Sequence, residues 1–173
     1  MEKRWNKLIQ TDVRLFYWIN HRWKCRSLDV MMRSITHLGG AVFTIFLSCY
    51  LLFFRPDLRS VALHVAIALA ASHLMVQLLK RRFWRIRPHL ALSHANTVPS
   101  PLVDSSFPSG HTTASFSIAI PFAIAYPPLA PLFLGLATTV ALSRIYLGLH
   151  YPSDVSMGAL LGASASFAVA FVL

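Results

Sequence analysis

Long runs of apolar residues, separated by short polar segments, fill most of the sequence after residue 40. The runs are Gly40–Phe54, Val61–Leu79, Thr112–Tyr126, Leu129–Leu142 and Val155–Leu173. A helix needs about 20 apolar residues to cross a bilayer, within a usual range of about 17–25. Two runs reach 19 residues, and the other three need flanking residues to span. The pattern predicts an all-α, polytopic membrane bundle of about five transmembrane helices.

The first 38 residues follow a different pattern. Between Trp5 and Trp23, apolar side chains recur at helical spacing with Lys and Arg between them, which is typical of an amphipathic helix that lies in the membrane interface. A second short helix is expected over Leu28–Thr36, with Ser27 as its N-cap. We therefore expect basic amphipathic interfacial helices over 1–38 and a transmembrane bundle over 39–173, within a single domain overall.

Composition supports a membrane protein and excludes most soluble classes. The chain is 55% hydrophobic and only 13% charged, against roughly a quarter charged in a typical soluble domain. A net charge of +10 would ordinarily suggest nucleic acid as a partner. The basic residues, however, concentrate in the first 26 positions and between Lys80 and Arg87, at the edges of the apolar runs, where they would meet lipid headgroups. We expect membrane lipids and no nucleic acid as partners.

The alternation of spans places the unusual polar residues on one side of the membrane. If the run from Gly40 leaves one face, the segment 80–88 returns to that face. The segments 108–111, 143–144 and 150–154 then lie at the same face. This convergence predicts a functional site at one end of the bundle.

The first candidate cluster is cationic. Lys80 and Arg87 are seven residues apart, two turns of a helix, and they share one face if the second span continues to Arg87. They could clamp a phosphate group, for which Arg supplies paired donors. The simpler alternative is that Lys80, Arg81, Arg82 and Arg85 only reach from the end of a span to the headgroups.

Two further clusters contain histidines. Ser109 and Gly110 precede the third span, where backbone N–H groups can bind an anion, although Ser109 could simply cap the helix. His111 follows directly, and an imidazole beside an anion site suits proton transfer. Pro152 marks the start of the last helix, so His150 lies just before it and Asp154 in its first turn. A carboxylate on one imidazole nitrogen would leave the other nitrogen free to attack.

Together with Arg144, these clusters form a three-part signature: Lys-x6-Arg-Pro, Pro-Ser-Gly-His and Ser-Arg-x5-His-x3-Asp. The sequence matches every position of it, in Lys80–Pro88, Pro108–His111 and Ser143–Asp154. On these motifs the chain resembles the type 2 phosphatidic acid phosphatase family, which shares its site with vanadium haloperoxidases. The resemblance extends from about Leu28 to the C-terminus and leaves the basic N-terminal helix outside the motifs.

The resemblance implies a two-step phosphatase that needs no metal and no cofactor. His150 would attack phosphorus to form a phosphohistidine, Asp154 would orient His150, and His111 would protonate the leaving oxygen. The phosphate oxygens would be held by Lys80, Arg87, Ser109, Gly110 and Arg144. The residue chemistry agrees, because phosphoryl transfer depends mainly on positioning and charge neutralisation. The substrate would be a lipid phosphate.

Several alternatives remain open at this stage. The headgroup could be undecaprenyl diphosphate, phosphatidylglycerol phosphate, phosphatidic acid or a lipid A phosphate, with family resemblance favouring the first two. A binding or transport module with the same cationic clamp is an alternative of another class, and a haloperoxidase shares the site.

The basic N-terminus favours a cytoplasmic site, whereas bacterial relatives favour the outer face of the cell membrane, which we choose. Gly158-x-x-x-Gly162 could join two subunits or pack within the chain, so the protein is expected to be a monomer or homodimer.

Overall fold

The computed structural model describes residues 2–98 and 103–172. Met1, the first residue of the predicted segment 1–38, and Leu173, the last residue of the predicted segment 39–173, lie outside the described residues. The described part is helical and contains no strand. The helices are α1 (Glu2–Arg22), α2 (Arg26–Ile35), α3 (Ala41–Phe54), α4 (Arg59–Arg82), α5 (Pro88–Ala91), α6 (Gly110–Ala125), α7 (Ala130–Tyr146) and α8 (Pro152–Ala170). Short 3-10 turns at Thr36–Gly39, Pro56–Leu58 and Pro127–Leu129 connect them.

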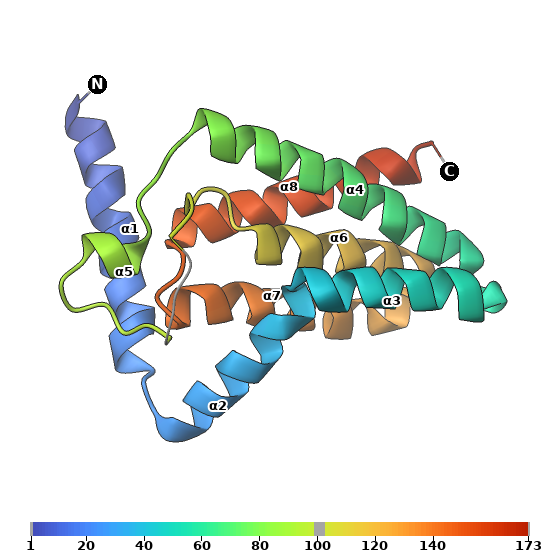
Figure 1. The fold of residues 1–173 in the computed structure, drawn as a ribbon, viewed down its shortest axis with the longest axis horizontal. Coiled ribbons are helices and arrows are strands. Elements are labelled where there is room, and N and C mark those ends of the chain that lie inside the picture. Colours follow the sequence, from blue (N-terminus) through green and yellow to red (C-terminus); the bar gives the residue numbers. More distant parts are fainter. Residues whose placement is uncertain (1, 99–102, 173) are drawn as a thin grey trace.

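The five predicted apolar runs form α3, α4, α6, α7 and α8, which lie alongside one another in one bundle (Figure 1). Within the described residues, three stretches are long and apolar enough to cross a membrane alone: Pro56–Arg82, Pro127–Tyr146 and Pro152–Ala170. A fourth span arises if Arg26–Gly39 and Ala41–Phe54, which meet at 53°, act as one broken helix. The fifth helix, α6, has only 16 residues. The all-α membrane bundle is confirmed, with three or four of its helical segments long and apolar enough to cross a membrane.

Helix α6 is the centre of the bundle, since it packs against α4, α7 and α8. Gly158 and Gly162 allow α8 to approach it closely. A Cβ atom on Gly158 would lie 2.6 Å from the Ser109 carbonyl oxygen, and one on Gly162 would collide with the Thr113 carbonyl oxygen. The Gly-x-x-x-Gly pair therefore packs two helices of the same chain. This is one of the two roles that the sequence left open for it, the other being to join two subunits.

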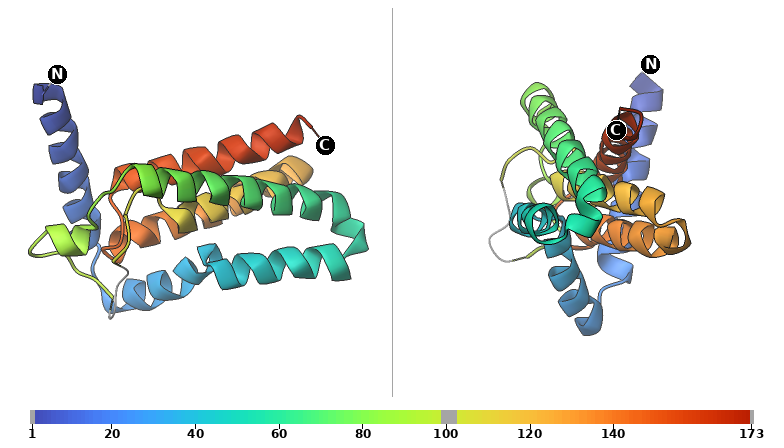
Figure 2. Two further views of the ribbon diagram at one scale, coloured as in Figure 1. Left: turned by 45° about the horizontal axis from the view of Figure 1, so that its top comes forward. Right: turned by 90° about the vertical axis from the view of Figure 1, so that its right-hand side faces the viewer.

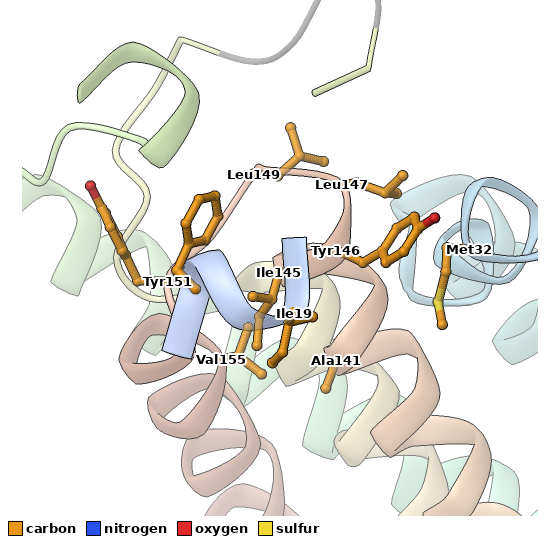
Figure 3. Close-up of a cluster of buried hydrophobic side chains, with 10 residues drawn as sticks. Ile19, Met32, Ala141, Ile145, Tyr146, Leu147, Leu149, Tyr151 and Val155 are labelled. Carbon is orange, nitrogen blue, oxygen red and sulfur yellow. The ribbon is translucent and has the colours of Figure 1, made fainter. Parts of the chain in front are cut away.

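Helix α1 crosses the end of the bundle from which α6 and α8 start (Figures 1 and 2). Its residues Phe16 and Ile19 are buried in a cluster with Ile145 and Val155 (Figure 3). The helix also exposes the apolar side chains of Leu8, Ile9, Leu15 and Trp18. The N-terminal helix is therefore amphipathic, as predicted, and one of its faces is part of the protein core beneath the candidate site.

Two predicted helix boundaries differ from the structure. The second helix begins at Arg26 with Cys25 as its N-cap, two residues before the predicted start at Leu28 with Ser27 as N-cap. More important, α4 ends at Arg82 and does not continue to Arg87. Beyond Arg82 the backbone bonds to another loop: the Ser105 hydroxyl accepts from the Arg85 N–H at 3.2 Å, and the Arg85 carbonyl accepts from the Ser106 N–H at 2.9 Å. Lys80 and Arg87 thus do not share a helix face.

Candidate active site

His150 lies in the short connection between α7 and α8. Gly148 has a φ of 73°, which only glycine adopts easily, and this turn reverses the chain after α7. The Arg144 carbonyl then accepts hydrogen bonds from the N–H groups of Leu149 at 3.0 Å and His150 at 3.2 Å. The end of α7 therefore fixes the backbone of His150 just before α8 begins at Pro152.

The imidazole of His150 has a different partner on each side. Its Nδ1 lies 2.6 Å from the Ser106 carbonyl oxygen, which can only accept, so Nδ1 carries the proton. Its Nε2 lies 3.1 Å from Nη1 of Arg87, which can only donate. Nearly complete burial lowers the pKa of His150 to about 4. The ring is therefore neutral at physiological pH, with the lone pair of Nε2 directed at a guanidinium group.

Asp154 is completely buried in the first turn of α8. Its Oδ2 accepts from the Tyr151 N–H at 2.9 Å and lies 3.8 Å from Nδ1 of His150. That distance suits an ion pair but exceeds a hydrogen bond. The sequence predicted that Asp154 itself would fix the tautomer of His150. In the structure the Ser106 carbonyl holds the Nδ1 proton, and Asp154 adds a nearby negative charge.

Lys80 and Arg87 are brought together by Asp104 rather than by a helix face. The Asp104 carboxylate lies 2.5 Å from Nζ of Lys80 and 2.6 Å from Nη2 of Arg87. Partial burial would raise the pKa of Asp104, but the hydrogen bonds from these two cations outweigh it and lower the pKa. Arg87 is itself buried and also donates to the Leu149 carbonyl at 2.9 Å. The two predicted phosphate ligands thus already hold one anion.

The Pro-Ser-Gly-His motif forms the start of α6. Ser109 is the N-cap residue, but its hydroxyl lies 2.9 Å from the Thr112 hydroxyl and makes no capping bond. The Ser109 N–H donates to the Asp154 carbonyl at 3.1 Å, which joins the start of α6 to α8. Gly110 begins the helix, where N–H groups lack partners within the helix.

His111 lies one residue further along α6 and is half-buried. A Cβ atom on Gly40 would lie 3.6 Å from its Nε2, so the ring is next to the start of α3. Among the hydrogen bonds of the described residues, none joins His111 to His150. The structure places both histidines at the same end of the bundle, His111 in the first turn of α6 and His150 in the connection before α8.

Arg144 is the third predicted cation, and it is 3% exposed in the last turn of α7. Its Nη1 donates to the Thr36 hydroxyl at 2.7 Å. Its Nε is buried without a hydrogen-bond partner in the described part of the chain. A buried guanidinium with a free N–H donor is costly unless an anion uses it, so this group fits phosphate binding.

Sequence reasoning missed four residues of this site. Asp104 and the carbonyl of Ser106 bind the predicted cations and His150, and Arg85 bridges Asp154 to Asp12 of α1. Arg85 was assigned only to headgroup contact. The sequence did contain one clue to these contacts. Asp12 is one of only six acidic residues in the chain, and it lies in a strongly basic segment.

Within the described residues, no three His, Cys, Asp or Glu side chains gather in a way that could hold a metal ion. The arrangement can instead bind an anion. Buried or half-buried cations surround a neutral imidazole, and a second imidazole lies at the mouth of the neighbouring helix. These are the groups that phosphoryl transfer requires.

Comparison with known proteins identifies the family. The chain is 43% identical over 94 residues to a decaprenylphosphoryl-5-phosphoribose phosphatase of Mycobacterium tuberculosis, an alignment that covers 54% of this chain and 50% of that protein. The chain spans about half the length of this and other curated relatives.

Two solved structures share the fold over nearly the whole chain. The crystal structure of Aquifex aeolicus LpxE matches with a TM-score of 0.83 and 29% identity, covering 92% of this chain and 94% of that one. A transmembrane PAP2 type phosphatidylglycerolphosphate phosphatase from Bacillus subtilis matches with a TM-score of 0.77 and 25% identity, covering 96% and 86%. The sequence profile of the PAP2 superfamily matches residues 61–172, which include all three motifs. This multi-pass membrane protein therefore belongs to the PAP2 superfamily.

Proposed function

We propose that this protein removes a phosphate group from a membrane lipid, with His150 as the nucleophile. The observation that carries the proposal is the state of the His150 ring. Nδ1 donates a hydrogen bond to the Ser106 carbonyl, so Nε2 carries no proton and its lone pair accepts from the Arg87 guanidinium. An acceptor nitrogen facing a phosphate-binding cation is the geometry that nucleophilic attack on phosphorus needs.

The reaction has two steps. In the first, Nε2 of His150 forms a bond to phosphorus as the bond from phosphorus to the lipid oxygen breaks, and His111 gives a proton to that oxygen. In the second, water attacks phosphorus as the bond from phosphorus to Nε2 of His150 breaks, His111 accepts a proton from the water, and inorganic phosphate leaves. Asp154 stabilises the positive charge that His150 acquires in the first step, from 3.8 Å away.

The cations stabilise the charge on the transferring group. Arg87 and Arg144 are buried, where an ion pair is stronger than in water, and Lys80 lies at the edge of the site. The Gly110 N–H at the start of α6 adds the positive end of a helix dipole. The Ser109 hydroxyl, now bonded to the Thr112 hydroxyl, can turn to donate to a phosphate oxygen. Asp104 must release Lys80 and Arg87 when the phosphate binds.

The substrate class follows from the place of the site. The site lies at one end of an apolar bundle, so a phosphate attached to a lipid chain can reach it from the membrane. Related proteins are named as phosphatases of a polyprenyl phosphate derivative and of phosphatidylglycerolphosphate. We favour undecaprenyl diphosphate or phosphatidylglycerol phosphate, ahead of phosphatidic acid and lipid A phosphates.

Phosphate release from a panel of these lipids tests the proposal. The purified protein is compared with His150→Ala and with His73→Ala, which removes an exposed imidazole on α4. We expect the first variant to lose activity and the second to keep it. Release from no lipid by folded protein, with phosphate binding retained, would favour a binding or transport module.

We further propose that residues 1–38 are interfacial and that the site faces the outer side of the cell membrane. The test uses a chain in which Cys25 and Cys49, both free and exposed, are replaced by serine and Val103, which is 71% exposed beside Asp104, by cysteine. We expect an impermeant thiol reagent to label Val103→Cys in intact cells. Labelling only after permeabilisation would place the site inside.

A further inference from the structure

Arg85 occupies a variable position of the Lys-x6-Arg-Pro motif, and its side chain joins α1 to the start of α8. One guanidinium nitrogen lies 2.7 Å from Oδ1 of Asp154, and the same nitrogen lies 2.7 Å from the Ser153 hydroxyl. The other terminal nitrogen lies 2.7 Å from Oδ2 of Asp12. Its guanidinium carbon is 4.0 Å above the centre of the Tyr151 ring. Four contacts therefore fix this side chain in one orientation.

Asp154 depends on this contact because its carboxylate has no access to water. A fully buried charge is stable only when it is paired and hydrogen-bonded. Oδ2 is bonded to the Tyr151 N–H and Oδ1 to Arg85. In the part of the chain that the structure describes, Arg85 is the only permanent cation within ion-pair distance of Asp154.

Asp12 completes the contact from the N-terminal helix. Its carboxylate accepts from the Ser153 N–H at 2.9 Å and from the Ser153 hydroxyl at 2.5 Å. Ser153 is in the first turn of α8, whose N–H groups have no partner within the helix. Asp12 thus caps α8 from another helix and holds Arg85 with the same carboxylate. Helix α1 is joined by these bonds to the turn that carries Asp154.

We propose that Arg85 and Asp12 are positioning residues, and that the N-terminal helix sets the place of the Asp154 carboxylate beside His150. The inference rests on the proposed function, because it assigns the two residues a role in that same reaction. Neither residue bonds to Lys80, Arg87 or Arg144, which hold the phosphate. Losing either one therefore affects the rate of the chemical step more than the binding of substrate.

Among the described residues, four charged or titratable side chains surround Asp154: Arg85, Asp12, His150 and Tyr151. Arg85 approaches from the segment between α4 and α5, Asp12 from α1, and His150 from the connection before α8. Removing Arg85 leaves two carboxylates near each other without the cation between them. Asp154 then moves away from Asp12 or takes up a proton, and in both cases His150 loses the negative charge that supports its attack.

The test measures kcat and KM for lipid phosphate hydrolysis in Arg85→Met, Arg85→Lys and Asp12→Asn. The matched control is Arg81→Met, which makes the same change at an exposed neighbouring position. We expect kcat to fall about tenfold or more in Arg85→Met with KM within about twofold, because small displacements of reacting groups have large effects on rate. Arg85→Lys should restore most of kcat, and Asp12→Asn should fall between the two. Equal kcat in Arg85→Met and Arg81→Met would overturn the proposal, as would a loss that appears only in KM.

A second measurement does not depend on activity. Hydrogen–deuterium exchange of the peptide from His150 to Met157 reports whether the first turn of α8 is held. We expect faster exchange in Arg85→Met and Asp12→Ala than in Arg81→Met. If the wild type releases no phosphate and exchange still accelerates, the proposed function fails and the coupling of α1 to Asp154 stands. Unchanged exchange in both variants would refute the coupling even in an active enzyme.

Discussion

Replacing Gly158 by alanine adds a single carbon atom at the contact between α8 and the start of α6. A Cβ at this position would lie 2.6 Å from the Ser109 carbonyl oxygen, 3.1 Å from Cβ of Thr112 and 3.2 Å from the Thr113 hydroxyl oxygen. Ordinary contact begins at 3.4 Å, so the carbonyl must move by 3.4 − 2.6, or about 0.8 Å. The same carbonyl accepts hydrogen bonds from the Thr113 N–H and hydroxyl, both at 3.0 Å, which resist the movement.

The displacement reaches the reacting groups directly. The Ser109 N–H is bonded to the Asp154 carbonyl, and His111 follows two residues later on α6. Inserting a methyl group into a packed interior costs about 1–3 kcal/mol, and a misplacement of about 1 Å in an active site can lower the rate about 100-fold. We therefore expect Gly158→Ala to lower kcat by about 10- to 100-fold and to lower the thermal midpoint.

The assay compares Gly158→Ala with Gly135→Ala in the same detergent, by phosphate release and thermal unfolding. Gly135 lies in α7, and a Cβ there would meet nothing within 4 Å. Alanine at an open helical position is neutral or stabilising by up to about 1 kcal/mol relative to glycine, so this control should keep its kcat and midpoint. Wild-type kcat and midpoint in Gly158→Ala would show that the packing of α8 on α6 does not fix the site.

Four further outcomes are expected. Asp104→Asn removes the half-exposed carboxylate that competes with phosphate for Lys80 and Arg87. Inorganic phosphate should therefore inhibit the variant about fivefold more strongly, because an ion pair of this kind is worth about 1 kcal/mol. Weaker inhibition by phosphate would contradict the competition. Burial lowers the pKa of His150 to about 4. The rate of the first phosphoryl transfer should therefore stay level as the pH falls and decline only near that value. A decline in rate centred at the ordinary histidine pKa would contradict the lowered pKa of His150. Since the unfolded chain binds this proton near pH 6.5, the free energy of unfolding should decrease by about 3 kcal/mol as the pH falls from about 6.5 to 4, which thermal unfolding across that range measures. Phosphate release should persist in EDTA; complete loss that a divalent cation restores would show that a metal takes part.

The apolar runs were sufficient to predict the helices because a membrane span is set by local composition alone. The placement of His150 before α8 and Asp154 in its first turn was also predictable, since Pro152 fixes where the helix begins. Helical spacing gave the wrong prediction that Lys80 and Arg87 share one helix face. The chain leaves α4 at Arg82 to bond with the loop around Ser105, and the residue before a proline avoids the helical conformation.

The contacts that join distant segments could not be predicted from the sequence. Asp12 and Arg85 are 73 residues apart. His150 donates its hydrogen bond to the backbone carbonyl of Ser106, a group that every residue type offers. Such pairs depend on how α1 and the loop before α6 fold over the end of the bundle. The buried Phe16, which fastens α1 to that end, resembles any other apolar residue of an amphipathic helix in the sequence.

The most direct test of the account is to trap the phosphoryl group on His150. The protein is mixed with lipid phosphate carrying a labelled phosphoryl group, quenched within one turnover, digested and analysed for the labelled peptide. The account predicts a label on His150 that survives alkali, is lost in acid and is absent from His150→Ala. A label on another residue, or phosphate release that continues in His150→Ala, would contradict it.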